Sequence, residues 1–172
     1  LSETVDFVEK AIYQDQQLLI VSLDCTGAFD YIGFASAEQS MGRLGIEPVI
    51  NRWYQHLLCH RRVFSKVLGT KDFTIPRRGS PQGGVLSPLV WNIIMDTLLV
   101  KFRNSPIKAI GYADDVLLMV AGKDTSTTTR LMQEALDKVI SWGDNNGLTF
   151  NPSKTNAMLC TMAYKKVMKP LQ

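Results

Sequence analysis

The sequence predicts an α+β fold built around one sheet, and three observations support this prediction. Residues 18–23 form a continuous apolar run, which is typical of a strand covered on both faces. Residues 107–112 and 116–121 are short runs of β-branched and aromatic residues joined by turn-forming residues, which predicts a β-hairpin. Residues 2–14 and 125–146 repeat apolar side chains at helical spacing.

The composition fits one globular domain that spans residues 1–172. The chain has 172 residues, of which 45% are hydrophobic, enough for a sizeable core. The net charge of +3 is compatible with a nucleic-acid partner, but many unrelated proteins are as basic.

The cysteines and the apolar runs bear on the compartment. Cys25, Cys59 and Cys160 are widely spaced and form no CxxC pair, so we expect reduced thiols and neither a disulfide framework nor a zinc site. We therefore expect an intracellular protein of the cytoplasm or nucleus, not a secreted one. The longest apolar run, residues 85–102, contains polar residues and a proline, so we expect no membrane segment.

The first half of the chain predicts a helix, a buried strand and two further helices. The helix at residues 2–14 starts so abruptly that the chain is as readily a piece of a larger protein as a whole one. The strand at 18–23 ends at Asp24, and Gly27 turns the chain before a second acid, Asp30; a cap at the strand end is one role open to Asp24. Helices follow at 36–44 and from Pro48 onward, the second with an inward face of Val49, Trp53, Leu57 and Leu58.

Residues 58–88 combine basic residues with a glycine-rich loop. A hairpin is predicted from strands 63–68 and 73–76 around residues 69–71. Basic residues recur here, as they do in contacts with phosphate backbones but also on ordinary solvated surfaces; they are Arg61, Arg62, Lys66, Lys71, Arg77 and Arg78. Three glycines and two prolines in residues 78–88 predict a shaped loop, which leads into a helix from Ser87 to about Arg103.

Two adjacent carboxylates, Asp114 and Asp115, occupy the turn of the hairpin at residues 107–121. Neighbouring carboxylates repel each other unless a cation neutralises them, and Mg²⁺ prefers oxygen ligands of this kind. A metal-assisted phosphoryl site and a plain solvated turn both fit this stretch taken alone.

The end of the chain predicts a packing helix and a short strand–turn–strand unit. In the helix at 125–146, ended by Gly147, the inward residues are Met132, Leu136, Val139 and Trp142. Residues 148–155 form a strand and a turn that carries Lys154, and residues 156–160 form the last strand. Lys165, Lys166 and Lys169 add basic charge near the end.

Four motifs in fixed order resemble a reverse transcriptase palm of the non-LTR retrotransposon (LINE-like) type. They are LDCTGAFD, RGSPQGGVLSP, GYADD and GLTFNPSKT, and together they extend from Asp24 to Lys154. The resemblance implies an α+β polymerase palm, an antiparallel β-sheet with helices packed on one face, together with part of the fingers. Most of the fingers and the thumb of that family have no counterpart in the sequence.

The resemblance also implies a catalytic site. Asp24, Asp114 and Asp115 would be metal ligands for two Mg²⁺ ions, which Mn²⁺ could replace, and Lys154 would act near the leaving pyrophosphate. Because Asp24 and Asp114 are far apart in sequence, only the tertiary fold could bring them together. A solvated turn lysine is the alternative role for Lys154.

Substrate contacts follow from the same motifs. Phe29 resembles the gate that crowds a ribose 2′-hydroxyl, or it is an ordinary core aromatic. Gln82 resembles the residue at the nascent base pair, with Gly83 letting the backbone lie close. Tyr112 either supports the primer terminus or packs on the sheet.

Two functions remain open from the sequence. The first is an RNA-directed DNA polymerase core that uses an RNA template, a DNA primer and deoxynucleoside triphosphates. The second is an inactive truncated or domesticated fragment that at most binds nucleic acid. All three acids are present, which favours the first.

Overall fold

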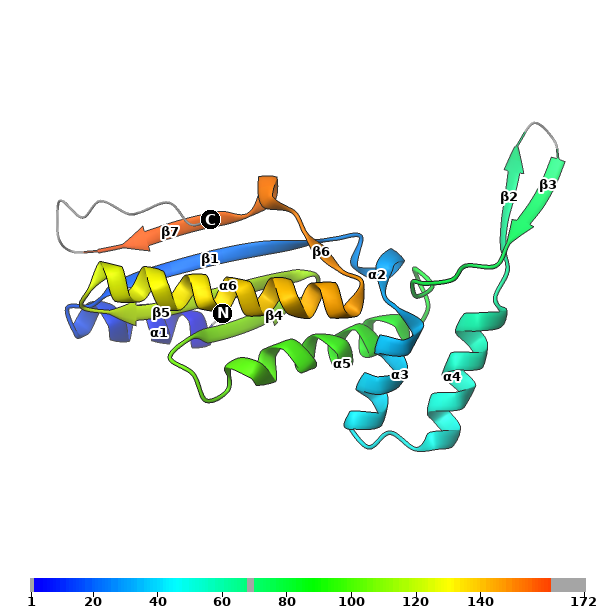
Figure 1. Cartoon of the computed structure of the whole chain (residues 1–172), viewed down its shortest axis with the longest axis horizontal. Coiled ribbons are helices and arrows are strands. Elements are labelled where there is room, and N and C mark those ends of the chain that lie inside the picture. Colours follow the sequence, from blue (N-terminus) through cyan, green and yellow to red (C-terminus); the bar gives the residue numbers. More distant parts are fainter. Residues whose placement is uncertain (1, 68–69, 162–172) are drawn as a thin grey trace. The chain divides into compact units, whose positions relative to one another are not determined.

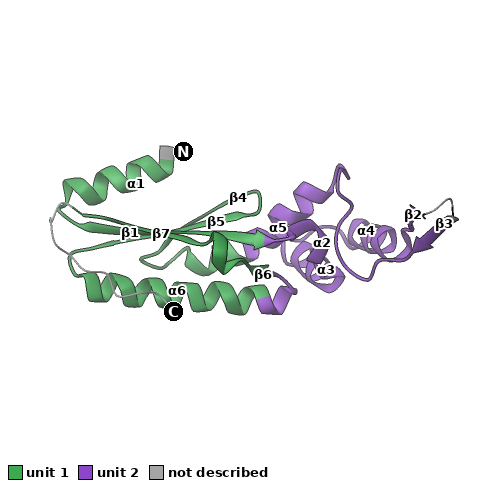
Figure 2. Ribbon diagram, turned by 90° about the horizontal axis from the view of Figure 1, so that it is seen from above, with its two compact units in different colours: residues 1–25, 98–143, 149–172 green, residues 26–97, 144–148 purple. Residues whose placement is uncertain are grey.

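The computed structural model describes residues 2–67 and 70–161, and it forms two compact units. The first unit comprises residues 1–25, 98–143 and 149–172, and the second comprises residues 26–97 and 144–148 (Figure 2).

The first unit is built on an antiparallel sheet centred on the ten-residue strand β1 (Gln17–Thr26). The other strands are β4 (Lys108–Tyr112), β5 (Asp115–Gly122), β6 (Thr149–Phe150) and β7 (Asn156–Cys160). The order is β4-β5-β1-β6, and β7 also pairs with β1. Strand β1 is antiparallel to both β5 and β7, and β4 is antiparallel to β5 (Figure 1).

Helices cover both faces of this sheet. Helix α1 (Ser2–Tyr13) buries Ala11 against Leu18 and Met119 on one face. Helix α6 (Thr125–Asn146) lies on the opposite side of the sheet in Figure 2. All four predicted inward residues of α6 are buried, namely Met132, Leu136, Val139 and Trp142. The α+β class with an antiparallel sheet is confirmed, but the prediction of helices on one face only was wrong, because α1 and α6 cover opposite faces. This double cover explains why residues 18–23 are apolar on both sides.

The second unit contains three helices before its hairpin. They are α2 (Ala28–Tyr31), α3 (Phe34–Arg43) and α4 (Pro48–His60), and α3 lies against α4 (Figure 1). Helix α4 is rotated from the predicted orientation: Leu58 is buried as expected, but its other buried residue is Tyr54. The prediction was wrong for Val49, Trp53 and Leu57, which are exposed. Apolar residues occupy most of the circumference of α4, so spacing alone could not select the buried face.

The rest of the second unit is a hairpin, an irregular loop and a helix. Strands β2 (Val63–Val67) and β3 (Thr70–Thr74) pair with Phe64 opposite Phe73, so the second strand starts three residues earlier than predicted. Helix α5 (Ser87–Leu99) continues as a 3-10 turn at Val100–Phe102 and buries Trp91, as the predicted helix from Ser87 to about Arg103 requires.

Strand β1 is longer than its apolar run. It does not end at Asp24: the register with β5 ends there, opposite Asp115, and the strand extends two residues further to Thr26. The predicted basic residues Lys165, Lys166 and Lys169 lie outside the described residues. No helix in the described part of the chain is long and apolar enough to cross a membrane.

Candidate active site

Three neighbouring strands of the first unit bring Tyr112, Asp115 and Asp24 into one row. Asp24 of β1 is the cross-strand partner of Asp115, and Asp115 is the partner of Tyr112 on β4. Side chains of directly opposed residues lie on the same face, with Cβ atoms roughly 4.5–5.5 Å apart. Tyr112 is 82% exposed, so the row faces solvent at that end. The fold therefore joins two acids that are remote in sequence.

The β4–β5 turn holds Asp114 beside the same end of β1. The turn residues are Ala113 and Asp114, and the carbonyl oxygen of Asp114 accepts a hydrogen bond of 3.3 Å from the backbone N–H of Cys25. Ala113 has a φ of 51°, a left-handed conformation that costs a residue with a Cβ about 1–2 kcal/mol. This tight turn places Asp114 next to the strand that carries Asp24.

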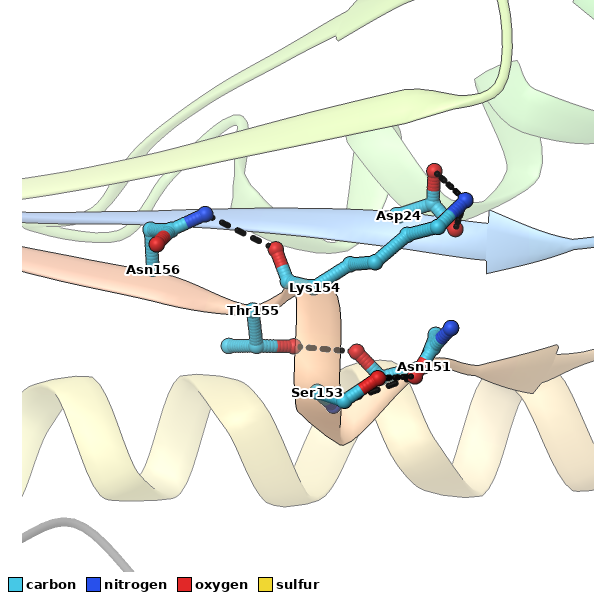
Figure 3. Close-up of polar contacts among 6 residues, drawn as sticks. All are labelled: Asp24, Asn151, Ser153, Lys154, Thr155 and Asn156. Atoms are coloured by element: carbon cyan, nitrogen blue, oxygen red, sulfur yellow. Dashed lines mark hydrogen bonds and ion pairs between the residues drawn. The ribbon is translucent and has the colours of Figure 1, made fainter.

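Lys154 contacts the row from the connection between β6 and β7. Its Nζ lies 3.3 Å from Oδ1 and 3.2 Å from Oδ2 of Asp24 (Figure 3). The 3-10 turn Pro152–Lys154 is capped by Asn151, whose side chain accepts from the backbone N–H of Ser153 at 3.0 Å. The N–H of Asn151 itself donates to the carbonyl oxygen of Asp24 at 2.9 Å. The segment that carries Lys154 is thus hydrogen-bonded directly to the backbone of Asp24.

Cys25 responds to the charge of these acids. Burial raises the pKa of the Cys25 thiol to about 12, and the charges of Asp114 and Asp24 contribute to the rise. A thiol with this pKa stays protonated at neutral pH and is a poor nucleophile. Cys25 is therefore a buried, neutral thiol next to Asp24 in the sequence of β1.

The donor set suits a hard divalent cation. Mg²⁺ is usually bound by one or two carboxylates together with substrate phosphates and water. The paired carboxylates of Asp24 and Asp115 supply such oxygen ligands, and Asp114 is adjacent in the turn. Within the described ranges, no group of three or more His, Cys, Asp or Glu side chains is arranged to hold a metal by itself.

The predicted substrate residues Phe29, Gln82 and Gly83 belong to the second unit. Phe29 lies on α2, is half-buried, and has its ring centroid 5.9 Å from that of Trp91. Gln82 is exposed, and its Nε2 donates to Oδ1 of Asp30 at 3.0 Å. The loop of Gln82 and the helix of Phe29 are therefore in direct contact.

Glycines let this loop lie on α2. A Cβ on Gly79 would sit 2.6 Å from the carbonyl oxygen of Asp30, so no other residue fits there without moving backbone. The N–H groups of Gly79 and Ser80 donate to the carbonyl oxygens of Ile32 and Phe29 at 2.7 and 2.6 Å. Gly83 has a φ of +79°, and a Cβ there would meet no atom within 4 Å, so its conformation and not crowding requires glycine.

Sequence reasoning missed a network of hydroxyl groups, on Tyr54, Ser80 and Ser87, that holds this loop in place. The hydroxyl of Ser80 donates to that of Ser87 at 2.8 Å, and Ser87 donates to the carbonyl oxygen of Pro81 at 2.6 Å. Each hydroxyl has one proton, so Tyr54, 3.0 Å from the Ser80 oxygen, must be the donor in that pair. The nearest sequence signal was two serines in a loop, which did not identify Tyr54 as their partner.

Arg61 also holds the loop, a role that neither alternative for the basic run, phosphate contact or a solvated surface, had included. Its Nη2 donates to the carbonyl oxygens of Arg78 and Gly79 at 3.0 and 2.9 Å. Burial lowers the pKa of its guanidinium. Arg78 lies with its guanidinium carbon 4.3 Å from the centroid of the Tyr31 ring. Two of the six basic residues in this region are thus engaged in loop structure.

Residues 2–170 match the family model described as reverse transcriptase (RNA-dependent DNA polymerase). The chain is 30% identical over 151 residues to the putative 115 kDa protein in type-1 retrotransposable element R1DM of Drosophila melanogaster; this covers 88% of the chain and 14% of that protein. It is 28% identical over 149 residues to a retrovirus-related Pol polyprotein from type-1 retrotransposable element R2 of Popillia japonica, covering 79% of the chain and 20% of the relative. The chain thus spans about a fifth or less of these relatives.

Solved structures show the same fold. The apo telomerase from Candida tropicalis, truncated from the C-terminal domain, matches with a TM-score of 0.76 at 16% identity, covering 98% of the chain and 36% of that structure. The Candida tropicalis telomerase in complex with the TWJ fragment of telomeric RNA matches with a TM-score of 0.71 at 14% identity, covering 92% and 29%. Together with the family match, the polymerase palm fold and the retrotransposon relatives confirm the predicted resemblance: the chain belongs to the reverse transcriptase family, of the non-LTR retrotransposon type.

Proposed function

We propose that residues 1–172 are the palm, with part of the fingers, of an RNA-directed DNA polymerase that adds deoxynucleotides to a primer 3′-hydroxyl. The row Tyr112–Asp115–Asp24, with Lys154 on Asp24, is the observation that carries this proposal. It gathers acids and a cation from separate segments at one end of the sheet, and a phosphoryl-transfer site needs such a group.

The carboxylates of Asp24, Asp114 and Asp115 would hold two divalent ions. When bound, these ions would lower the pKa of the primer hydroxyl and offset the charge of the triphosphate. The acids themselves fix where the primer terminus and the triphosphate meet. Both Mg²⁺ and Mn²⁺ suit such oxygen ligands.

Lys154 has a second role in this proposal. Once its ammonium is released from Asp24, it is close enough to the acids to place a positive charge or a proton at the leaving pyrophosphate. Tyr112, at the exposed end of the row, would support the primer terminus.

The second unit would select the nucleotide and contact the template. Phe29 would crowd a ribose 2′-hydroxyl, and Gln82, with the open backbone at Gly83, would touch the nascent pair. An RNA template is supported by the family match and by the structural neighbour in complex with telomeric RNA. The primer and the deoxynucleotides are inferred from the family chemistry.

Primer extension tests this function. A DNA primer on an RNA template is incubated with the chain and deoxynucleotides in Mg²⁺ and then in Mn²⁺, beside Asp24→Asn, Asp114→Asn and, as the matched control, Asp144→Asn at an exposed position. We expect extension by the chain and the control, and a loss of about 100-fold or more in the two site variants. Extension that survives either site change would refute the site.

A fragment that only binds nucleic acid is the second candidate. The ion pair between Lys154 and Asp24 favours it, because it neutralises one of the acids that would hold a metal ion. Binding of the primer–template by chain and variants alike, with no extension by any of them, would identify this function.

A further inference from the structure

The β2–β3 hairpin presents one face that combines aromatic rings and cations. Phe64 and Phe73 are cross-strand partners with ring centroids 5.9 Å apart. Arg62 lies with its guanidinium carbon 5.0 Å from the centroid of the Phe73 ring. Lys66, two residues beyond Phe64 on the same strand, shares that face because side chains alternate along a strand.

The rings on this face are more exposed than their role in the hairpin requires. Phe64 is 66% exposed and Phe73 is 48% exposed. A cross-strand aromatic pair does stabilise a hairpin, but a two-stranded sheet is at best marginally stable in water. Large exposed apolar surface of this kind marks an interaction site. Figure 1 shows the two strands extending beyond the end of α4.

The charges decide the kind of partner. Arg62 and Lys66 are exposed cations beside the rings, and the one acid of the described hairpin, Asp72, is paired with Ser65 and so faces the other side. Its carboxylate already accepts from the N–H of Phe73 at 2.8 Å. Rings flanked by cations fit a polyanion with flat apolar groups, which describes nucleic acid with unpaired bases.

We propose that this face, consisting of Arg62, Phe64, Lys66 and Phe73, binds an unpaired nucleic-acid strand. Bases stack on Phe64 and Phe73, and Arg62 and Lys66 contact the phosphates. The bound nucleic-acid strand is the template; this assignment rests on the proposed polymerase function. Duplex is a poor ligand for the face, because paired bases are not available for stacking.

Binding of a fluorescent 15-mer of oligouridylate to the 172-residue chain, followed by anisotropy, tests the face. Each base stacked on an aromatic ring contributes about 5–150-fold in affinity. We therefore expect Phe64→Ala and Phe73→Ala each to weaken binding within that range. Phe64→Tyr and Phe73→Tyr keep a ring and should bind like the unchanged chain. Ser65→Ala, on the other side of β2, is the matched control and should have no effect.

The cations are tested by salt. Replacing Arg62 or Lys66 by Gln should reduce the slope of log affinity against log salt by about 0.7 for each phosphate that is no longer neutralised. A 5-iodouracil probe should crosslink to Phe64 or Phe73, as mass spectrometry of the digested complex would show. Unchanged affinity in both Ala variants, equal losses in the Ala and Tyr variants, or crosslinks confined to other regions would overturn the proposal.

These outcomes are separable from failure of the proposed function. Oligouridylate binding and primer extension are measured separately on each variant, so loss of one does not imply loss of the other. A chain that binds through the hairpin but extends no primer would count against extension by residues 1–172 and keep the binding face. A chain that extends primers but ignores the ring substitutions would refute the face alone.

Discussion

Lys154 and Asp24 form an ion pair in which one ammonium lies within 3.3 Å of both carboxylate oxygens. The side chain of Asp24 is only 24% exposed, whereas that of Lys154 is 62% exposed. The lysine therefore neutralises an acid that, in the proposed function, would hold a divalent ion.

Replacing Lys154 by Met should tighten binding of divalent cations. A unit charge about 4 Å away contributes at least about 1 kcal/mol, so we expect the dissociation constant for Mn²⁺ to fall by about fivefold or more. Titration of free Mn²⁺ by electron paramagnetic resonance measures this directly. Lys138→Met, at an exposed position of α6, is the control. An unchanged constant in Lys154→Met would show that metal does not compete with the lysine.

Phe29→Ala should admit ribonucleotides in a chain that extends primers. The smaller side chain removes the ring that would crowd a 2′-hydroxyl, and we expect the ratio of kcat/KM for ribonucleotide to deoxynucleotide to rise about tenfold or more. Steady-state kinetics with both sugars measures the ratio. Since Phe29 also contacts Trp91, a Trp91→Phe variant controls for disturbed packing. Unchanged sugar preference with Phe29→Ala would show that the ring is only a packing residue.

Ser80→Ala should destabilise the fold by about 1–3 kcal/mol, because it removes a buried hydroxyl that bonds to both Tyr54 and Ser87. Urea unfolding measures the decrease in the free energy of unfolding. The same change made in a Tyr54→Phe background should cost less, since one of its two partners is already gone. Strict additivity of the two substitutions would contradict the directed chain from Tyr54 through Ser80.

Ala113→Gly should stabilise the acidic turn. Glycine adopts the φ of 51° without steric cost, and after its larger loss of backbone entropy we expect a net gain of up to about 1 kcal/mol. Ala109→Gly in β4 has no such strain to relieve and should lose about 0.5–1 kcal/mol. Thermal unfolding of the two variants should therefore shift in opposite directions. A loss in both would mean that Ala113 is not strained.

Asp124 should make stability depend on pH. Hydrogen bonds from Ser126 and Thr127 lower the pKa of this carboxyl below its ordinary value of 3.8, and they cap the start of α6. A lowered folded-state pKa stabilises the protein above the unfolded value, and the contribution is lost as the pH falls toward the folded one. The melting temperature of the chain should exceed that of Asp124→Asn above about pH 5, and the gap should shrink below about pH 4. A gap that is constant with pH would refute the capping charge.

Local pattern predicted the elements that depend on local physics. Helix α6 matches its predicted bounds because its apolar residues keep one face and Gly147, at a φ of +70°, ends it. The burial of β1 on both faces was equally predictable, since a strand covered by α1 and α6 shows no polar alternation. The rotation of α4 was not predictable, because Tyr54 and Trp53 are neighbours and only the packed partner decides which is buried.

The candidate site likewise combines residues that the sequence motifs predicted with contacts that only the fold could reveal. Motif order identified Asp24, Asp114, Asp115 and Lys154, and the fold then placed Asp24 opposite Asp115. Spacing could not give that register, because it depends on which strands pair. The bond between Gln82 and Asp30 was invisible for a related reason: it joins two segments separated by 52 positions. The roles of these residues stay predictions until they are measured.

Backbone hydrogen bonds join the segment of α2 to the loop at residues 78–82, and so link the two residues proposed to contact the nucleotide and the template. Gly79 and Ser80 bond to the carbonyl oxygens of Ile32 and Phe29, and no Cβ fits at Gly79. Phe29 and Gln82 therefore lie on two segments that backbone hydrogen bonds hold together. With the roles proposed above for Phe29 and Gln82, a library that randomises Phe29 alone would keep the position of Gln82, so sugar preference and template contact would have to be redesigned together.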